Sequence, residues 1–116
     1  MKLFENEDDY GNIEYKRHII LTSTSKIHHY ISQIKYRVTE GNGTAYYLIG
    51  INDDGTISNV SNDILNLSLT NFKKLVNALN YEIKNIAKYS YFDKNFYIIK
   101  IHADLDIYSD LSYFIT

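Results

Sequence analysis

The sequence contains neither cysteine nor proline in its 116 residues. Without cysteine the chain can form no disulfide framework, no thiolate nucleophile and no cysteine-based zinc site. This absence fits a reducing compartment, and we therefore expect a cytoplasmic protein.

Long hydrophobic runs are also missing. No stretch approaches the roughly 18 apolar residues that a membrane span needs. The first residues, MKLFENEDDYGN, hold two adjacent apolar residues and then a series of acids, which does not match the apolar centre of a signal peptide. We expect a soluble protein with no membrane partner.

The composition is that of one globular domain. Hydrophobic residues make up 45% of the chain and aromatic residues 15%, which is ample for a single core. The net charge of -2 is too small to mark the whole chain as a nucleic-acid binder, so any charged surface must be local. Asn, Ile, Lys and Tyr are abundant and share AT-rich codons, which suggests an AT-rich source such as a large DNA virus or an intracellular parasite.

Hydrophobic periodicity predicts a sequence of seven elements. Strands are predicted at 13–21, where apolar residues alternate, at 44–51, which is apolar on both faces as in a central strand, and at 56–60, 81–91 and 96–103. Two segments instead show apolar residues at spacings of three and four, one after the possible N-caps of residues 22–25 and one after Ser61. The order is β-α-β-β-α-β-β, an α+β fold close to a ferredoxin-like two-layer sandwich with an added C-terminal strand.

The same patterns divide the chain into three parts. Residues 1–11 are acidic and aperiodic, and we interpret them as a flexible lead-in, with order beginning near Asn12. Residues 12–103 form the single α+β domain. Residues 104–116 have weak patterning and are interpreted as a tail or as the start of a continuation.

Motifs for catalysis or cofactor binding are absent from the sequence. Neither GxxxxGK[ST] nor GxGxxG occurs, and the glycines of Gly41-Asn42-Gly43 are expected to end a helix. His28 and His29 are adjacent and would diverge on a helix, so we expect no metal site. We expect this chain to be no enzyme and to hold no cofactor.

Several positions are assigned to backbone geometry. The pair Asp53-Asp54 with the following glycine predicts a tight turn, because glycine accepts a positive φ. The positions expected to matter for turns are Gly41, Gly43, Gly50, Asp54 and Gly55.

One segment stands out by its charge. Residues 16–38 contain no acid, and their basic side chains are interspersed with aromatic ones, a combination that can hold a phosphate backbone and stack bases. An ordinary solvated face with tyrosines in the core is the alternative. The candidate RNA- or protein-binding residues are Lys16, Arg17, His18, Lys26, Lys35, Tyr36 and Arg37.

Four motifs in order carry a resemblance to a known family. They are GNIEYK at residues 11–16, QIKYRVTEGNG at 33–43, AYYLIGINDDG at 45–55 and SLTNF at 68–72. This order resembles the N-terminal domain of the GTP-binding protein 1 and 2 family, relatives of elongation factor 1-alpha. In that family a GTPase domain with its phosphate-binding loop follows, whereas such a loop is absent here.

The resemblance implies a non-catalytic accessory domain of a GTP-binding translation factor. It would offer a protein- or RNA-binding surface, with tRNA, the ribosome or other RNA and a C-terminal GTPase domain as partners. GTP and Mg²⁺ are implied only for that downstream domain. A stand-alone RNA-binding module is the alternative, and the IGINDDG segment at residues 49–55 also resembles Schlafen and AlbA-type domains that handle nucleic acid.

Overall fold

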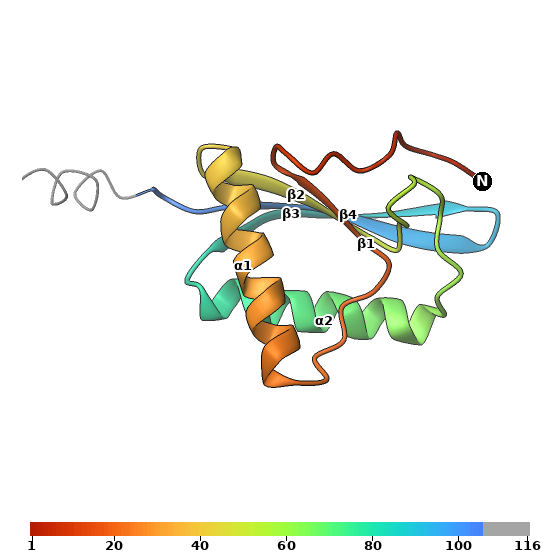
Figure 1. Ribbon diagram of the computed structural model, residues 1–116. Helices are drawn as coiled ribbons and strands as arrows, with labels where there is room; N and C mark the ends of the chain where they lie inside the picture. The colour runs from red at the N-terminus through yellow and green to blue at the C-terminus, as the bar shows by residue number, and fades with distance from the viewer. Residues whose placement is uncertain (106–116) are drawn as a thin grey trace, which may run out of the picture.

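The computed structural model describes residues 1–105. Four strands and two helices follow one another along this part of the chain (Figure 1). They are β1 (Ile13–Lys16), α1 (Thr24–Glu40), β2 (Thr44–Ile49), α2 (Asn62–Ala78), β3 (Glu82–Tyr91) and β4 (Lys94–His102). The predicted tail at 104–116 lies, from residue 106 onward, outside the described residues.

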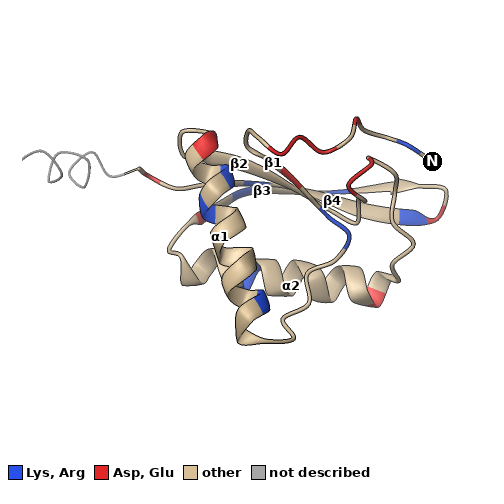
Figure 2. Cartoon of the chain, viewed as in Figure 1, with Lys and Arg blue, Asp and Glu red and all other residues tan. Residues whose placement is uncertain are grey.

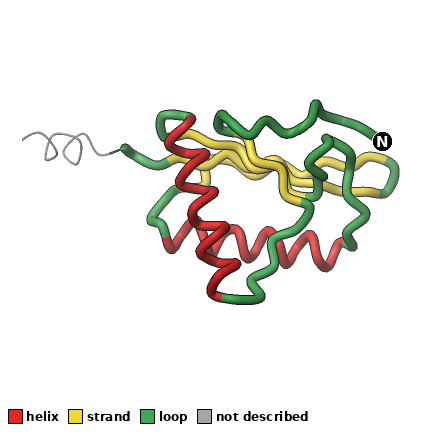
Figure 3. The backbone as a smooth tube through the Cα atoms, viewed as in Figure 1, coloured by secondary structure: helices red, strands yellow, loops and turns green. Residues whose placement is uncertain are grey.

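The strands form one mixed sheet. Its order is β1-β2-β4-β3, in which β1 and β2 are parallel and the other neighbouring strands are antiparallel. Both helices lie on the same side of this sheet (Figure 3). The arrangement confirms the predicted α+β, ferredoxin-like two-layer sandwich.

Both helices begin at the serine caps that the sequence contains. The Ser23 hydroxyl accepts a hydrogen bond from the Lys26 backbone N–H, and the Ser61 hydroxyl accepts one from the Ile64 N–H. Each cap satisfies a backbone donor that the first helical turn leaves without a partner.

The larger core lies between the helices and the sheet. Ile34 and Val38 of α1, Tyr47 of β2 and Phe72 of α2 are fully buried there. The rings of Tyr47 and Phe72 lie 4.6 Å apart between centroids, a favourable distance for an aromatic pair. This core fixes the direction in which each element presents its remaining side chains.

Strand β1 is shorter than predicted because the chain leaves the sheet after Lys16. Ile19 is nevertheless fully buried, which explains the apolar alternation of residues 13–21. Its backbone bonds to two side chains of α2: the Ile19 N–H donates to the Ser68 hydroxyl at 2.9 Å, and its carbonyl accepts from the Asn71 amide at 2.9 Å. A buried loop held by polar side chains therefore has the sequence pattern of a strand.

The prediction of a strand at residues 56–60 is also wrong. This segment makes two single bridges, Lys2 with Thr56 and Ile51 with Ile57, and no continuous ladder. The buried residues Ile57 and Ser58 produced the strand-like pattern. The sheet of the described residues therefore has four strands, one fewer than predicted.

The N-terminal segment covers the opposite face of the sheet (Figure 1). Leu3 and Phe4 pack against a second buried cluster that includes Tyr15 and Phe96, and the Leu3 N–H donates to the Gly55 carbonyl at 2.9 Å. The prediction that order begins near Asn12 is thus corrected: two apolar residues and several backbone hydrogen bonds hold this acidic segment against the sheet.

Candidate functional site

The structure disperses the residues predicted for binding. Arg17, Lys26 and Lys35 are exposed, and Lys16 and His18 are partly buried. Figure 2 shows basic residues on α1 and in the loop after β1, and acidic residues along the N-terminal segment beside them. The basic character is therefore confined to part of the predicted surface.

Lys16 and Lys26 come together at one aromatic ring. Their ammonium nitrogens lie 5.4 Å and 5.2 Å from the centroid of the Tyr30 ring, within the range of cation–π attraction. Tyr30 itself is buried. Burial lowers the pKa of Lys16, the charges of Glu14 and Glu7 oppose this shift, and the charge of Lys26 adds to it. This pair, with exposed Arg17 directly after Lys16, forms the basic end of the surface.

Arg37 is buried and serves the fold. Its Nε donates to the Glu14 carboxylate at 3.1 Å, and only 3% of its side chain is exposed. Its terminal nitrogens donate to the carbonyls of Tyr10, Gly11 and Asp8 at 2.8 to 2.9 Å. A guanidinium saturated in this way cannot reach an RNA phosphate, so Arg37 is not available for the binding role predicted from the sequence.

Tyr36 has a related position at the same end of α1. The residue is 41% exposed, and its hydroxyl proton is shared between two acceptors, the Asp9 carbonyl at 3.1 Å and the Glu40 carboxylate at 3.2 Å. Burial and the neighbouring Glu40 carboxylate raise its pKa. Together with Arg37, it fastens the N-terminal segment to α1.

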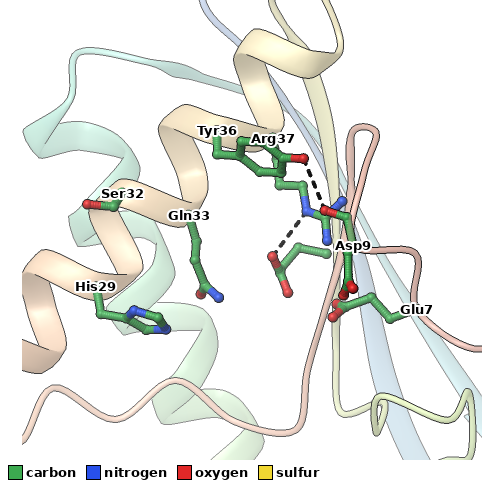
Figure 4. A pocket seen from close by; sticks show the side chains of 8 residues that line it. Glu7, Asp9, His29, Ser32, Gln33, Tyr36 and Arg37 are labelled. Carbon is green, nitrogen blue, oxygen red and sulfur yellow. Dashed lines mark hydrogen bonds and ion pairs between the residues drawn. The ribbon is translucent and has the colours of Figure 1, made fainter.

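A cavity of about 330 Å³ lies where this segment meets α1 (Figure 4). Three acids, Glu7, Asp9 and Glu14, approach it from the segment and from β1, while α1 supplies the opposite wall. Its lining residues are Glu7, Asp9, Glu14, His29, Ser32, Gln33, Tyr36 and Arg37.

Among the acids that line this cavity, Glu7 is the one with a strongly raised pKa. Burial, a hydrogen bond with the Glu14 carboxyl and the charges of Glu14 and Asp53 raise the pKa of Glu7 to about 7. A backbone N–H, that of Tyr15, donates to the Glu7 carboxylate and partly opposes this effect. Glu7 therefore keeps its proton to a higher pH than an exposed carboxyl group does.

Sequence analysis missed this pair of carboxyl groups. Glu7 and Glu14 are seven residues apart, in a loop and a strand, and no spacing rule connects two such positions. Carboxylates beside the C-terminal half of α1 would repel phosphate, so this part of the predicted surface is unfavourable for an anion.

Glycine is needed at the predicted turn positions for two different physical reasons. Gly43, Gly50 and Gly55 have positive φ values, and the Asp54 carboxylate accepts hydrogen bonds from Thr56 that lower the Asp54 pKa. Gly41 instead has φ -97°, but a Cβ atom there would come within 1.8 Å of the Thr44 carbonyl oxygen. Gly41 is thus required by space and not by its φ angle.

The described part of the chain contains neither a candidate metal site nor a helix able to span a membrane. Within residues 1–105, no group of three His, Asp or Glu side chains is placed to hold a metal ion. None of the helices in this part of the chain combines the length and the apolar character required to cross a bilayer.

Comparison with known proteins found similarity to GTP-binding proteins. The chain is 33% identical over 79 residues to GTP-binding protein 2 of Mus musculus, and the same values hold for GTP-binding protein 2 of Homo sapiens. The match includes 68% of this chain and 13% of either relative, so the chain spans only a small part of their length.

A viral protein is similar over a comparable stretch. The chain is 34% identical over 84 residues, or 72% of its length, to an uncharacterized protein of Acanthamoeba polyphaga mimivirus, of which 45% is matched. No family model and no solved structure matches the chain. The similarity supports a relationship to GTP-binding protein 2, in agreement with the motif resemblance at this level.

Proposed function

We propose that this chain is a non-catalytic accessory domain of a GTP-binding, translation-factor-like protein. The observation that carries the proposal is the 33% identity to GTP-binding protein 2 over 68% of a chain whose sequence has no GxxxxGK[ST] loop. On this proposal GTP and Mg²⁺ are held by a GTPase domain elsewhere, and the domain contributes a protein- or RNA-binding surface.

The basic end of the surface is the part that we assign to binding. Arg17 and Lys26 are exposed, and the Lys16 ammonium lies against the same ring as that of Lys26. Basic groups gathered in this way suit contact with a nucleic-acid backbone. We place RNA, such as tRNA or ribosomal RNA, first among the partners, and a protein surface of acidic character second.

Charge reversal with a matched control tests this surface. We would measure the affinity for single-stranded and hairpin RNA of the variant Arg17→Glu/Lys26→Glu at two salt concentrations. The control Lys73→Glu/Lys74→Glu changes the net charge equally at exposed positions of α2. We expect only the first variant to lose affinity, with a weaker salt dependence by about one unit of slope for each lost phosphate contact.

Equal affinity of the two variants would exclude the proposed basic surface. The accessory role needs a separate measurement, the mass of the natural gene product in its source cells. A product several times larger than 13.6 kDa that contains a GxxxxGK[ST] peptide is expected. A product of 13.6 kDa would favour the stand-alone RNA-binding module instead.

A further inference from the structure

A second cavity lies where the two parallel strands end. The chain turns away from the sheet after Lys16 of β1 and after Ile49 of β2, and the cavity of about 290 Å³ is formed by the segments that follow. Its lining residues are Arg17, Asn52, Ser58, Asn59 and Val60. The carboxyl ends of parallel strands are a frequent location of ligand sites, because the chain diverges there and leaves a crevice.

Ser58 gives this cavity an unusual property. Only 3% of the residue is exposed, and its backbone N–H donates to the Gly50 carbonyl at 2.8 Å. Its side-chain hydroxyl is buried and has no hydrogen-bond partner within residues 1–105. Buried hydroxyls almost always have a partner, since leaving one unpaired costs free energy. Ser58 is also a lining residue of the cavity, so a ligand that enters it would give this hydroxyl a partner.

The charge of the cavity indicates which ligand fits. Arg17 is the only charged residue among the five that line it, and across residues 1–105 its guanidinium forms no ion pair or side-chain hydrogen bond. The nearby Asp54 carboxylate is occupied by Thr56, and neither Asp53 nor Asp63 lines the cavity. Guanidinium, hydroxyl and amide groups together present donors to a compact group of oxygen acceptors.

We propose that Arg17, Ser58 and Asn59 form a binding site for one phosphate group of an RNA backbone. The Arg17 fork would donate to two phosphate oxygens and the Ser58 hydroxyl to a third position, while the Asn59 amide closes the rim. The choice of RNA rests on the proposed function, whereas the phosphate chemistry rests on the cavity itself.

Inorganic phosphate is the first probe of the site. A titration followed by the amide resonances of the protein is compared with sodium chloride of equal ionic strength, for the wild type, Arg17→Gln, Ser58→Ala and the exposed control Lys35→Gln. We expect saturable shifts at residues 17 and 58–60 in the wild type and in Lys35→Gln. Affinity should fall about tenfold in either cavity variant, the loss typical of one charge-assisted hydrogen bond.

Thermal unfolding separates a ligand role of Ser58 from a structural one. Removal of a hydroxyl that has no partner should leave the midpoint of Ser58→Ala equal to or above that of the wild type. A lower midpoint would reveal a structural partner and overturn the assignment of this hydroxyl to a ligand. Uniform shifts that chloride reproduces would equally overturn the site.

Short single-stranded RNA is the second probe and distinguishes this inference from the proposed function. Weaker RNA binding by Arg17→Gln and Ser58→Ala than by Lys35→Gln would support the site. RNA binding by the wild type that both cavity variants retain in full would overturn the site and leave the proposed RNA surface standing. Phosphate shifts without any RNA binding would overturn the RNA assignment together with the RNA form of the proposed function.

Discussion

Arg37 shows how a single charged residue can be placed in the interior. Its side chain bonds to Glu14 and to three carbonyls of residues 8–11, so four hydrogen bonds replace the water that burial removes. A buried charge is tolerated only with such partners. Arg37 therefore links α1, β1 and the N-terminal segment in one network.

We predict a large loss of stability in Arg37→Met. The substitution leaves the Glu14 carboxylate buried without its cation, a change that costs about 3–5 kcal/mol. The control Lys35→Met lies on the exposed side of the same helix and should remain within about 0.5 kcal/mol of the wild type. Urea denaturation measures both, and similar midpoints for the two variants would contradict the buried network.

Glu7 predicts a pH dependence of stability. Its pKa is raised from 4.5 to about 7 in the folded protein, so between these values the folded state binds more proton than the unfolded state. Stability must then decrease as pH rises through this window, the opposite of the usual salt-bridged carboxylate. We expect this decrease to be smaller in Glu7→Gln than in the wild type.

Denaturation midpoints across the same window provide the test. Glu5→Gln, which changes an exposed carboxylate of the same segment, is the control and should follow the wild type. A wild-type stability that increases with pH over this range, or equal slopes for Glu7→Gln and the wild type, would show that the pKa of Glu7 is not raised in the folded protein.

At the scale of elements, local signals were reliable where local physics decides the structure. The serine caps and apolar spacing located both helices, and α1 ends at Glu40 immediately before the predicted Gly41. The predicted turn at 53–55 is present, with φ +83° at Gly55. Short strands were less reliable, because a strand exists only when a partner lies beside it. Residues 56–60 have the pattern but form only single bridges.

Gly55 tests how a turn and the N-terminal segment depend on each other. A Cβ atom there would come within 1.9 Å of the Phe4 carbonyl oxygen, in addition to the strain of a positive φ. Gly11 has a similar φ of +86° and no atom within 4 Å, which makes it a control for strain alone. We expect Gly11→Ala to cost about 1 kcal/mol and Gly55→Ala distinctly more.

The measurement is the denaturation midpoint of each variant. Equal losses would mean that the N-terminal segment does not lie against the turn. A greater loss in Gly55→Ala, accompanied by changed resonances of Leu3 and Phe4, would verify their contact.

At the scale of the whole molecule, one sheet carries two cores. The helices cover one face, the N-terminal segment covers part of the other, and strands β2 and β4 contribute to both clusters. If β2 or β4 leaves the sheet, both clusters lose residues and are exposed to water together. The described domain is therefore expected to unfold as one cooperative unit.

Phe4→Ala tests this coupling across the sheet. The substitution removes a ring that lies 5.8 Å from Phe96 and 6.2 Å from Tyr15, and we expect a loss of about 2 kcal/mol, below that of a fully buried Phe. Leu3 packs against one cluster and Ile99 belongs to the other. In Phe4→Ala the amides of both residues should lose their native resonances at one urea concentration, which is lower than in the wild type. Earlier loss at Leu3 with an unchanged midpoint at Ile99 would contradict a single unit.

The sequence by itself determined the fold class, both helices with their caps, the turn at Gly55 and the resemblance to GTP-binding proteins, because these depend on neighbours within a few residues or on motif order. Tertiary structure alone decided which partners the charged and buried polar residues have. Whether Arg37 binds RNA or Glu14, whether Glu7 holds a proton, and whether Ser58 lacks a partner all depend on atoms that are distant in the chain. Burial and electrostatics arise between such atoms, and no local pattern records them.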